Sequence, residues 1–279
     1  MKLRTAVLLW SLLVCMGLGL CAGAGAEDLP EEPAEETVAR LPDDVLMTYY
    51  DGTMFVGDSQ VRKFQNYVKK TQKKVPGYFA NIDFRAENSY KFRFVAYRTI
   101  PSGELKYAHL KMKGKKVTLF DIVKEQKPKR VMILAGINDA LTTDYKNENG
   151  VERAMRYVRG GTELIREASP ETEIFFITQM PVTSRFAQGS NRAPAVKERW
   201  DEINSAIRSE SEALGITLMD LTSGLTDEKG FLPGKLCEDG KCHLNDAGYA
   251  VFGQNLLDFA QAEYEAGRWT PGGTAETEE

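Results

Sequence analysis

Histidine is the scarcest chemically useful side chain in this 279-residue chain, which contains only His109 and His243. A reaction that uses imidazole as its base must therefore use one of these two residues. Two histidines without a Cys/His cluster cannot build a usual zinc site, so we predict no bound metal and no cofactor.

A surplus of basic residues is also missing. The chain has 36 Lys and Arg against 40 Asp and Glu, a net charge of −4, with no basic stripe. Nucleic-acid binding proteins carry such a stripe, so we expect no nucleic acid as a partner.

Long apolar runs are confined to the amino terminus. Lys2 and Arg4 precede the apolar residues 6–20 and the small residues 22–26, which is typical of a secretory signal peptide over residues 1–26. An uncleaved anchor helix is the alternative. No later run approaches the roughly 18 apolar residues of a membrane span. We therefore expect an exported protein, periplasmic or extracellular, with no integral membrane segment after cleavage and a net charge of −6.

Two cysteines, Cys237 and Cys242, lie beyond the signal peptide. Exported proteins meet an oxidising compartment, and a pair this close in sequence favours a disulfide. Two free buried thiols are the alternative.

The rest of the chain alternates apolar runs with amphipathic segments. Residues 27–44, rich in Glu and Pro, predict a solvated linker, and residues 267–279 a disordered tail. Between them, residues 45–266 predict one catalytic domain. The expected strands are 54–56, 131–135, 174–177 and 216–221, and the expected helices are 61–74, 118–126, 151–167, 194–214 and 245–262. This alternation predicts an α/β fold with a mainly parallel central sheet.

Residues 78–117 are harder to assign. Tyr78–Ile82 resembles a short strand, and Phe92–Val95 another strand or a loop edge. Residues 105–117 predict a β-hairpin that turns at Gly114. His109 lies there among lysines, which is consistent with an anion-binding patch or, more simply, with a charged exposed hairpin.

The most informative stretch is Gly57-Asp58-Ser59, which ends the first predicted strand and precedes a helix. Open α/β sheets place their chemistry at this position. A serine hydroxyl needs a base within hydrogen-bond reach to become a nucleophile. Since the lysines around His109 disfavour an imidazolium there, Ser59 and His243 form the expected pair.

Two further roles follow from this pair. A carboxylate should orient the imidazole, and Asp239 is the nearest candidate, with Glu238 behind it. The developing oxyanion needs donors, for which we expect the backbone N–H of Ser59 and the side-chain amide of Asn138. The candidates for substrate binding are Asp58, Asp139 and Arg185.

Together these motifs resemble the SGNH (GDSL-type) hydrolase superfamily. The matching blocks are Phe55-Val56-Gly57-Asp58-Ser59, Leu134-Ala135-Gly136-Ile137-Asn138-Asp139, Glu238-Asp239-Gly240, His243-Leu244-Asn245 and Gly248-Tyr249. The resemblance implies a three-layer α/β/α, flavodoxin-like fold and ester hydrolysis through an acyl-serine. The Gly-x-Ser-x-Gly elbow of α/β-hydrolases is absent, because Val61 stands at its last position.

Two departures from the family pattern matter. The family places its aspartate three residues before the histidine, whereas Asp239 lies four before His243. Either a Cys237–Cys242 bridge draws Asp239 into place, or a backbone carbonyl orients His243 in a dyad. The family's second block also carries an oxyanion glycine, and no glycine occurs between Gly77 and Gly103, so the N–H of Asn88 or Ser89 is the expected substitute.

The sequence thus predicts an exported serine esterase that removes acyl groups, most often acetyl, from a carbohydrate or cell-wall glycan. A lipase or lysophospholipase is the second possibility, although the polar loop 182–194 argues against a long apolar groove. A catalytically weak glycan-binding or assembly protein that keeps the fold is the third.

Overall fold

A computed structural model describes residues 38–107, 109–140, 150–188 and 194–272 of the chain. The described residues from Ala39 onward form one compact unit. The predicted signal peptide and most of the predicted linker lie outside the described residues. The last two linker residues, Asp43 and Asp44, begin helix α1 (Asp43–Met47), which is followed by the 3₁₀ helix η1 (Thr48–Tyr50). No helix in the described ranges is both long and apolar enough to cross a membrane.

A five-stranded parallel sheet forms the centre of this unit, in the order β2-β1-β5-β6-β7. Every residue of the neighbouring strands β1 and β5 is buried, as continuous apolar runs predict for strands covered on both faces. The α/β class with a parallel sheet is therefore confirmed. The strand bounds are β1 Thr53–Gly57, β2 Asp83–Ala86, β5 Arg130–Leu134, β6 Glu173–Ile177 and β7 Thr217–Met219.

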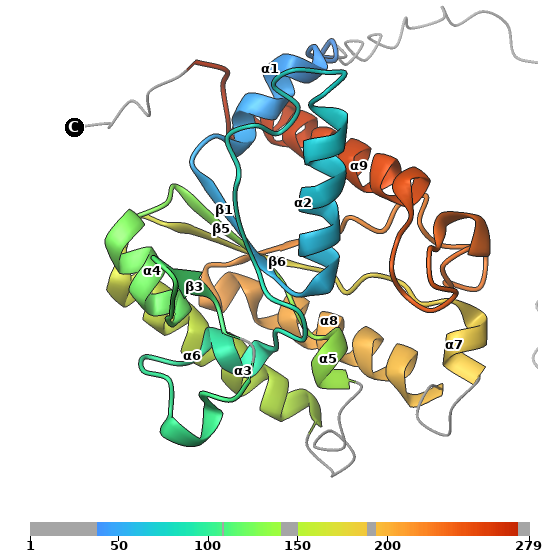
Figure 1. Cartoon of the computed structure of the whole chain (residues 1–279). Helices are drawn as coiled ribbons and strands as arrows, with labels where there is room; N and C mark the ends of the chain where they lie inside the picture. Colours follow the sequence, from blue (N-terminus) through green and yellow to red (C-terminus); the bar gives the residue numbers. More distant parts are fainter. Residues whose placement is uncertain (1–37, 108, 141–149, 189–193, 273–279) are drawn as a thin grey trace, which may run out of the picture. The chain divides into compact units, whose positions relative to one another are not determined.

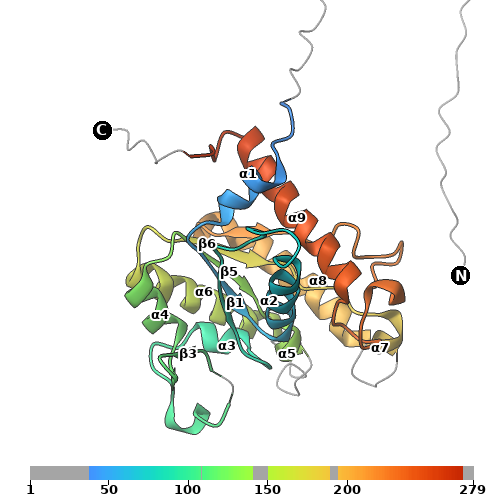
Figure 2. The same cartoon turned by 45° about the horizontal axis from the view of Figure 1, so that its top comes forward.

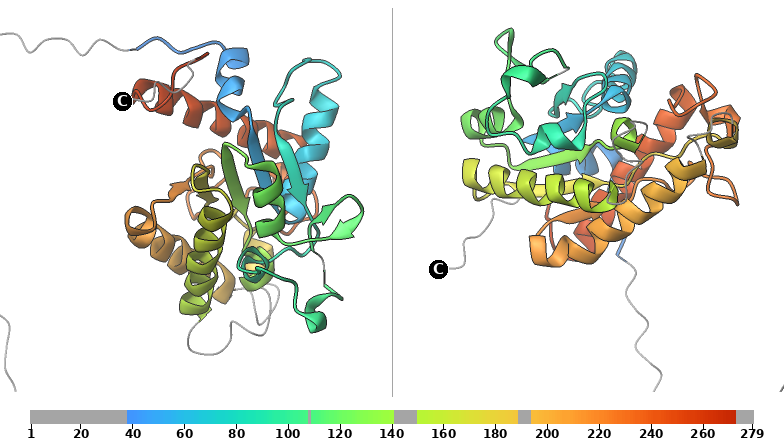
Figure 3. Two further views of the ribbon diagram at one scale, coloured as in Figure 1. Left: turned by 90° about the vertical axis from the view of Figure 1, so that its left-hand side faces the viewer. Right: turned by 90° about the horizontal axis from the view of Figure 1, so that it is seen from below.

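Helices cover both faces of the sheet, and successive strand residues point to opposite layers. Phe55 packs with residues of α1, α2 and α9, whereas its neighbours Met54 and Val56 pack with residues of α3, α4, α6 and α8. Figure 1 and the left view of Figure 3 show the sheet between these two layers. The helix bounds are α2 Ser59–Thr71, α3 Phe92–Val95, α4 Leu119–Gln126, α6 Gly150–Ala168, α8 Pro194–Leu214 and α9 Asp246–Glu265.

Side-chain caps fix where three of these helices begin. Thr118 and Asp121 form a capping box at the start of α4. Asp58 caps α2, and Asn245 caps α9 by accepting a hydrogen bond from the backbone N–H of Gly248. The caps of α2 and α9 lie beside Ser59 and His243, so local sequence fixes the backbone next to both residues.

The segment between α2 and α4 differs from the prediction in two places. Tyr78–Ile82 forms turns rather than a strand, because Gly77 (φ 91°) and Phe79 (φ 42°) have left-handed backbone conformations. Phe92–Val95 is one turn of helix, α3, whose side chains bury together against α6 instead of alternating between two faces.

The predicted hairpin exists but is shorter. Its strands are β3 (Lys111–Met112) and β4 (Lys115–Lys116), preceded by the 3₁₀ helix η2 (Ser102–Glu104). The predicted disordered tail is wrong at Trp269, which is buried and lies edge-on to Tyr49. Residues 273–279 lie outside the described residues.

Parallel strands end at one edge of the sheet, and the candidate site residues follow these ends. Ser59 follows β1, and Asn138 lies in the short helix α5 (Ile137–Ala140) after β5. The same edge carries α7 (Ser184–Gln188), which follows β6, and the right view of Figure 3 looks toward this edge. The 3₁₀ helix η4 (Gly234–Leu236) leads to the His243 loop, and Figure 2 shows how α9 continues from that loop.

Candidate active site

Ser59 is the first residue of α2, directly after the turn that ends β1. The backbone there runs so close to β5 that a Cβ on Gly57 would lie 2.2 Å from the carbonyl oxygen of Leu134. Asp58 then caps the helix, with its Oδ1 accepting from the backbone N–H of Gln60 at 2.9 Å. The first N–H groups of a helix have no intrahelical acceptor. The Ser59 N–H is therefore available to bind an anion beside its own hydroxyl.

The structure brings His243 to this serine across 184 residues of sequence. Ser59 Oγ and His243 Nε2 are 2.9 Å apart, a hydrogen-bond distance. His243 lies just before α9 and is partly buried. The hydroxyl can therefore give its proton to the imidazole, as a nucleophile and its base require.

Asp239 lies on the other side of the imidazole. Its Oδ2 is 2.6 Å from His243 Nδ1, so Nδ1–H is held toward the carboxylate and Nε2 is free to accept from Ser59. Its side chain is about one-third exposed, 32%, against 24% for His243. Asp239, and not a backbone carbonyl, thus occupies the orienting position.

A tight turn accommodates the four-residue spacing between Asp239 and His243. Asp239 Oδ1 accepts from the backbone N–H groups of Lys241, Cys242 and His243, at 2.8, 3.0 and 3.2 Å. Gly240 has φ 68°, a conformation that residues with a Cβ rarely adopt, and this folds the turn around the carboxylate. Burial alone would raise the pKa of Asp239, but the hydrogen bonds from His243 and the three N–H groups hold it well below its usual range.

The predicted disulfide is not present in the structure. Cys237 and Cys242 are buried free thiols. Cys237 packs in the apolar cluster on the α2 and α9 side, whereas Cys242 packs with Ile137, Val182 and Trp200. Backbone bonds hold the loop instead, including one from Glu238 N to His243 O at 2.8 Å.

Thr183 anchors the outer side of the same loop. Its N–H donates to the carbonyl oxygen of Lys241 and its hydroxyl to that of Gly240, both at 2.8 Å. The Asp239 turn is therefore fixed without a covalent bridge.

Asn138 reaches the site from the end of β5. Its Nδ2 donates to Asp58 Oδ2 at 2.9 Å and lies 3.3 Å from the carbonyl oxygen of Tyr90. The carboxylate anchors the amide, and the longer contact to Tyr90 is the one that a stronger acceptor could replace. The role of Asn138 as an oxyanion donor stays a prediction, and it requires that the oxyanion replace Tyr90 as the acceptor.

Asp58 and Asp139 were predicted as possible substrate-binding residues, and the structure places both behind the site. They are only 1% and 2% exposed, and Asp139 Oδ2 accepts from the backbone N–H of Phe92 at 3.0 Å. Burial, together with the nearby charge of Asp139, raises the pKa of Asp58 to about 7. These carboxylates position loops of the protein and do not face a substrate.

Ser89 stands where the missing second-block glycine was expected. It is exposed and has φ 62°, the left-handed conformation that a glycine would adopt without strain. Residues 88–89 form a turn directly before Tyr90, whose carbonyl oxygen contacts Asn138. That the N–H of Asn88 or Ser89 replaces the missing glycine donor stays a prediction.

The remaining candidates are His109 and Arg185. His109 is buried, with Nε2 2.9 Å from the carbonyl oxygen of Glu104 and its ring against Phe94, so it is a core residue and not part of an anion-binding patch. Arg185 is exposed on α7, and its role in substrate binding stays a prediction.

A metal-ligand set overlaps the His243 loop, contrary to the expectation that no Cys/His cluster exists. One oxygen of Asp239, Sγ of Cys242 and a ring nitrogen of His243 lie within 4.8 Å of one another. Burial raises the pKa of the Cys242 thiol to about 12, which keeps it protonated. The Asp239 and His243 atoms already bond each other, so a metal here would have to displace that bond.

Sequence reasoning did not single out Gln60, the residue after the serine. Its side chain is only 3% exposed, and Nε2 donates to the carbonyl oxygen of Cys242 at 2.5 Å. One feature of the sequence points to it: a polar amide stands directly after Gly-Asp-Ser, in the first turn of the helix, where the side chain is buried.

Comparisons with known proteins agree with this geometry. Residues 55–251 match the model of the GDSL-like lipase/acylhydrolase family. Among curated proteins, no match was found.

Two solved structures show the same fold. A GDSL-like lipase from Bacteroides thetaiotaomicron is 14% identical, with a TM-score of 0.53 over 76% of this chain and 88% of its own. An acetyl xylan esterase is also 14% identical, with a TM-score of 0.51 over 74% of this chain and 98% of its own. With its family match and its Ser59–His243–Asp239 arrangement, the chain belongs to the GDSL-like lipase/acylhydrolase family and is an SGNH-type serine ester hydrolase.

Proposed function

We propose that this protein is an exported esterase, periplasmic or extracellular, that removes acyl groups, chiefly O-acetyl, from a carbohydrate or cell-wall glycan. The observation that carries the chemistry is the hydrogen-bonded series Ser59–His243–Asp239, with Asn138 beside it. The signal peptide predicted at the amino terminus supports export to a compartment where such glycans occur.

Acylation begins when Ser59 Oγ attacks the carbonyl carbon of the ester while His243 Nε2 takes the hydroxyl proton. Asp239 stabilises the imidazolium that results. The carbonyl oxygen becomes an oxyanion, and the N–H groups of Ser59 and Asn138 donate to it. When the tetrahedral intermediate collapses, the sugar alkoxide leaves, takes the proton from His243, and an acyl-serine remains.

Deacylation repeats these steps with water. His243 removes a proton from the water as its oxygen attacks the acyl carbon, and the oxyanion returns to the same donors. Collapse then releases the carboxylic acid, and the serine oxygen regains the proton from His243. No metal or redox group takes part in this balance.

A short acyl group fits the surroundings better than a long chain. The apolar residues beside Asn138 and His243 pack against one another in a closed cluster. Each is 7% exposed or less: Ile137, Val182, Trp200 and Cys242. Within the described ranges, the large exposed hydrophobic residues are Val38, Val75, Leu105 and Tyr107, and none belongs to the loops carrying Ser59, Asn138 or His243. A lipase would need an open apolar groove at this place.

The experiment is a chain-length series. The protein is incubated with p-nitrophenyl acetate, butyrate and octanoate and with acetylated oligosaccharides, alongside Ser59→Ala. We expect acetate to give the highest kcat/KM and free acetate to be released from the oligosaccharides. Preference for octanoate would favour the lipase alternative. Equal inertness of the protein and Ser59→Ala toward all substrates would favour a binding or assembly protein.

A further inference from the structure

Gln60 is buried at the junction between the nucleophile helix and the His243 loop. Buried amide groups in folded proteins are almost always hydrogen-bonded, and both ends of this one are. Nε2 donates to the carbonyl oxygen of Cys242 at 2.5 Å, and Oε1 accepts from the Tyr249 hydroxyl at 3.0 Å. Tyr249 is itself only 4% exposed, so water cannot easily replace these bonds.

The two bonds connect the three parts of the chain that meet at the reacting atoms. Gln60 follows Ser59 in the first turn of α2, and Cys242 precedes His243 in its loop. Tyr249 lies in the first turn of α9, directly after that loop. One amide thus fixes both ends of the His243 segment relative to the serine, whose Oγ is 2.9 Å from Nε2.

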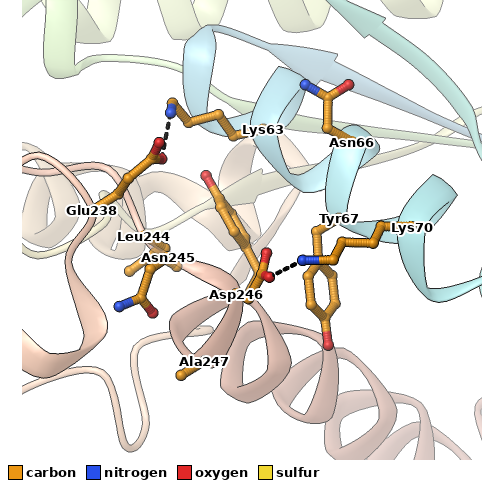
Figure 4. Close-up of a pocket in the computed structure, with 10 residues that line it drawn as sticks. Lys63, Asn66, Tyr67, Lys70, Glu238, Leu244, Asn245, Asp246 and Ala247 are labelled. Carbon is orange, nitrogen blue, oxygen red and sulfur yellow. Dashed lines mark hydrogen bonds and ion pairs between the residues drawn. The ribbon is translucent and has the colours of Figure 1, made fainter.

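The Tyr249 hydroxyl also lies 3.2 Å from the backbone carbonyl oxygen of Gln60, whereas the ion pairs across the same boundary are exposed. Lys63 pairs with Glu238 at 2.5 Å, but the two side chains are 33% and 56% exposed, and Lys70 pairs with Asp246 still further out. Figure 4 shows these two ion pairs bridging α2 and the segment from Glu238 to α9 along an open groove. Exposed ion pairs contribute little to stability, so they cannot fix the position of the His243 ring relative to Ser59 within a fraction of an ångström.

The fourth letter of the family's GDSL motif is leucine, whereas this chain has glutamine. A leucine fills a similar volume but cannot donate or accept a hydrogen bond. The link through Gln60 is therefore a feature of this chain and not of the motif.

We propose that Gln60 is a positioning residue: it holds His243 at hydrogen-bond distance from Ser59 by binding the Cys242 carbonyl and the Tyr249 hydroxyl. The inference rests on ester hydrolysis by Ser59 and His243 and is independent of the natural substrate. Gln60 does not touch the ester, so its effect falls on the rate of the chemical step and not on substrate binding.

The test compares Gln60→Leu, Tyr249→Phe, the double variant and Lys63→Met as the control across the same boundary. The measurements are kcat and KM on p-nitrophenyl acetate, the second-order rate of Ser59 phosphonylation by a fluorophosphonate, and the number of active sites by titration with it. Melting temperatures check folding. Phosphonylation forms an O–P bond, releases fluoride and passes the serine proton to His243, so its rate reports the base without an ester.

We expect Gln60→Leu to lower kcat per titrated site about 10- to 100-fold with KM within about twofold, since misplacing a catalytic group by about 1 Å costs about 10². The phosphonylation rate should fall in parallel. Tyr249→Phe should lower kcat roughly two- to fivefold, because the bond to Cys242 remains. The double variant should be no slower than Gln60→Leu, and Lys63→Met should stay within about twofold of the parent protein.

Three outcomes would overturn the proposal. One is a kcat per site in Gln60→Leu within twofold of the parent. Another is a rise in KM at constant kcat, which would show that Gln60 acts on substrate binding, or a smaller number of titrated sites that each keep the normal kcat, which would show that it acts on folding. The third is an equal loss in Lys63→Met, which would show general loosening of the boundary. A parent protein that neither hydrolyses the ester nor reacts with the fluorophosphonate would instead refute the esterase conclusion, and with it the positioning role of Gln60.

Discussion

Replacing Asp239 separates its two tasks, orienting His243 and holding its own turn. Asp239→Asn keeps an oxygen that can accept from the backbone N–H groups of residues 241–243. It places an amide N–H₂ opposite Nδ1, where Oδ2 now accepts at 2.6 Å. Two donors cannot face each other, so the imidazole must move its proton to Nε2, the nitrogen that should accept from Ser59.

The magnitude follows from this wrong tautomer. In serine hydrolases an aspartate-to-asparagine change of this kind lowers kcat about 10⁴-fold. That ratio corresponds to about 5.5 kcal/mol of lost transition-state stabilisation. Asp239→Ala should lose kcat to a similar extent, because nothing then orients the imidazole or stabilises its charged form.

The two variants should differ in stability. Asp239→Ala leaves three backbone N–H groups of the turn without their acceptor, and hydrogen bonds to a charged group contribute roughly 1.5–3 kcal/mol before allowance for solvent. The turn is partly exposed, so we expect a loss of about 1–3 kcal/mol in the free energy of unfolding for Asp239→Ala and less than about 1 kcal/mol for Asp239→Asn.

The assay is kcat on p-nitrophenyl acetate at pH 8 together with urea unfolding of both variants. Asp239→Asn is the more informative variant, because its turn stays capped. If it retained kcat within tenfold of the parent, the reasoning would be wrong and His243 would work as a dyad with Ser59. Equal stabilities of the two variants would refute the assignment of the Asp239 Oδ1 contacts.

Three other outcomes are expected. Ser59→Ala should lower kcat by about 10⁶ and abolish fluorophosphonate labelling, since the acyl-serine cannot form; retained labelling would place the nucleophile elsewhere. Asn138→Ala should lower kcat about 10²- to 10³-fold at nearly constant KM through loss of an oxyanion donor. The raised pKa of Asp58, about 7 against an ordinary 3.8, gives stability that is present below pH 4 and lost as the pH rises toward 7. Between pH 4.5 and 7.5, the free energy of unfolding measured in urea should therefore fall less for Asp58→Asn than for the parent, by roughly 2–4 kcal/mol. An equal fall in both proteins would contradict the raised pKa of the buried Asp58 carboxyl.

The sequence predicted the strands and long helices that carry the site because each has a strong local pattern. The run 131–135 became β5, fully buried, and the helix expected at 194–214 is α8 with the same bounds. Prediction failed where the pattern was short. At Phe92–Val95 three apolar residues in four fit either a strand or one helical turn, and only packing against α6 decides between them.

The site residues were recognisable because each stands where a strand or a loop meets a helix. Ser59, Asn138 and His243 were found in this way. The structure pairs Ser59 with His243 and bonds Asn138 to Asp58, the residue before Ser59. The burial of Asp58 and Asp139 could not be predicted from the sequence. An acidic residue in a loop after a strand has the same local sequence pattern whether its side chain faces solvent or another loop.

By itself the sequence determined the α/β architecture, the serine at the start of α2 and the choice of histidine, because periodicity, capping and the scarcity of His are properties of the chain. Tertiary structure decided what supports them. Gly240 lets the chain fold around Asp239 so that the extra residue before His243 is absorbed, and the two cysteines fall into separate apolar clusters. Gln60 acquires its partners only when α2 and α9 pack side by side, since Cys242 and Tyr249 are more than 180 residues away along the chain. Such contacts depend on the distance between elements in the fold, which no local pattern encodes.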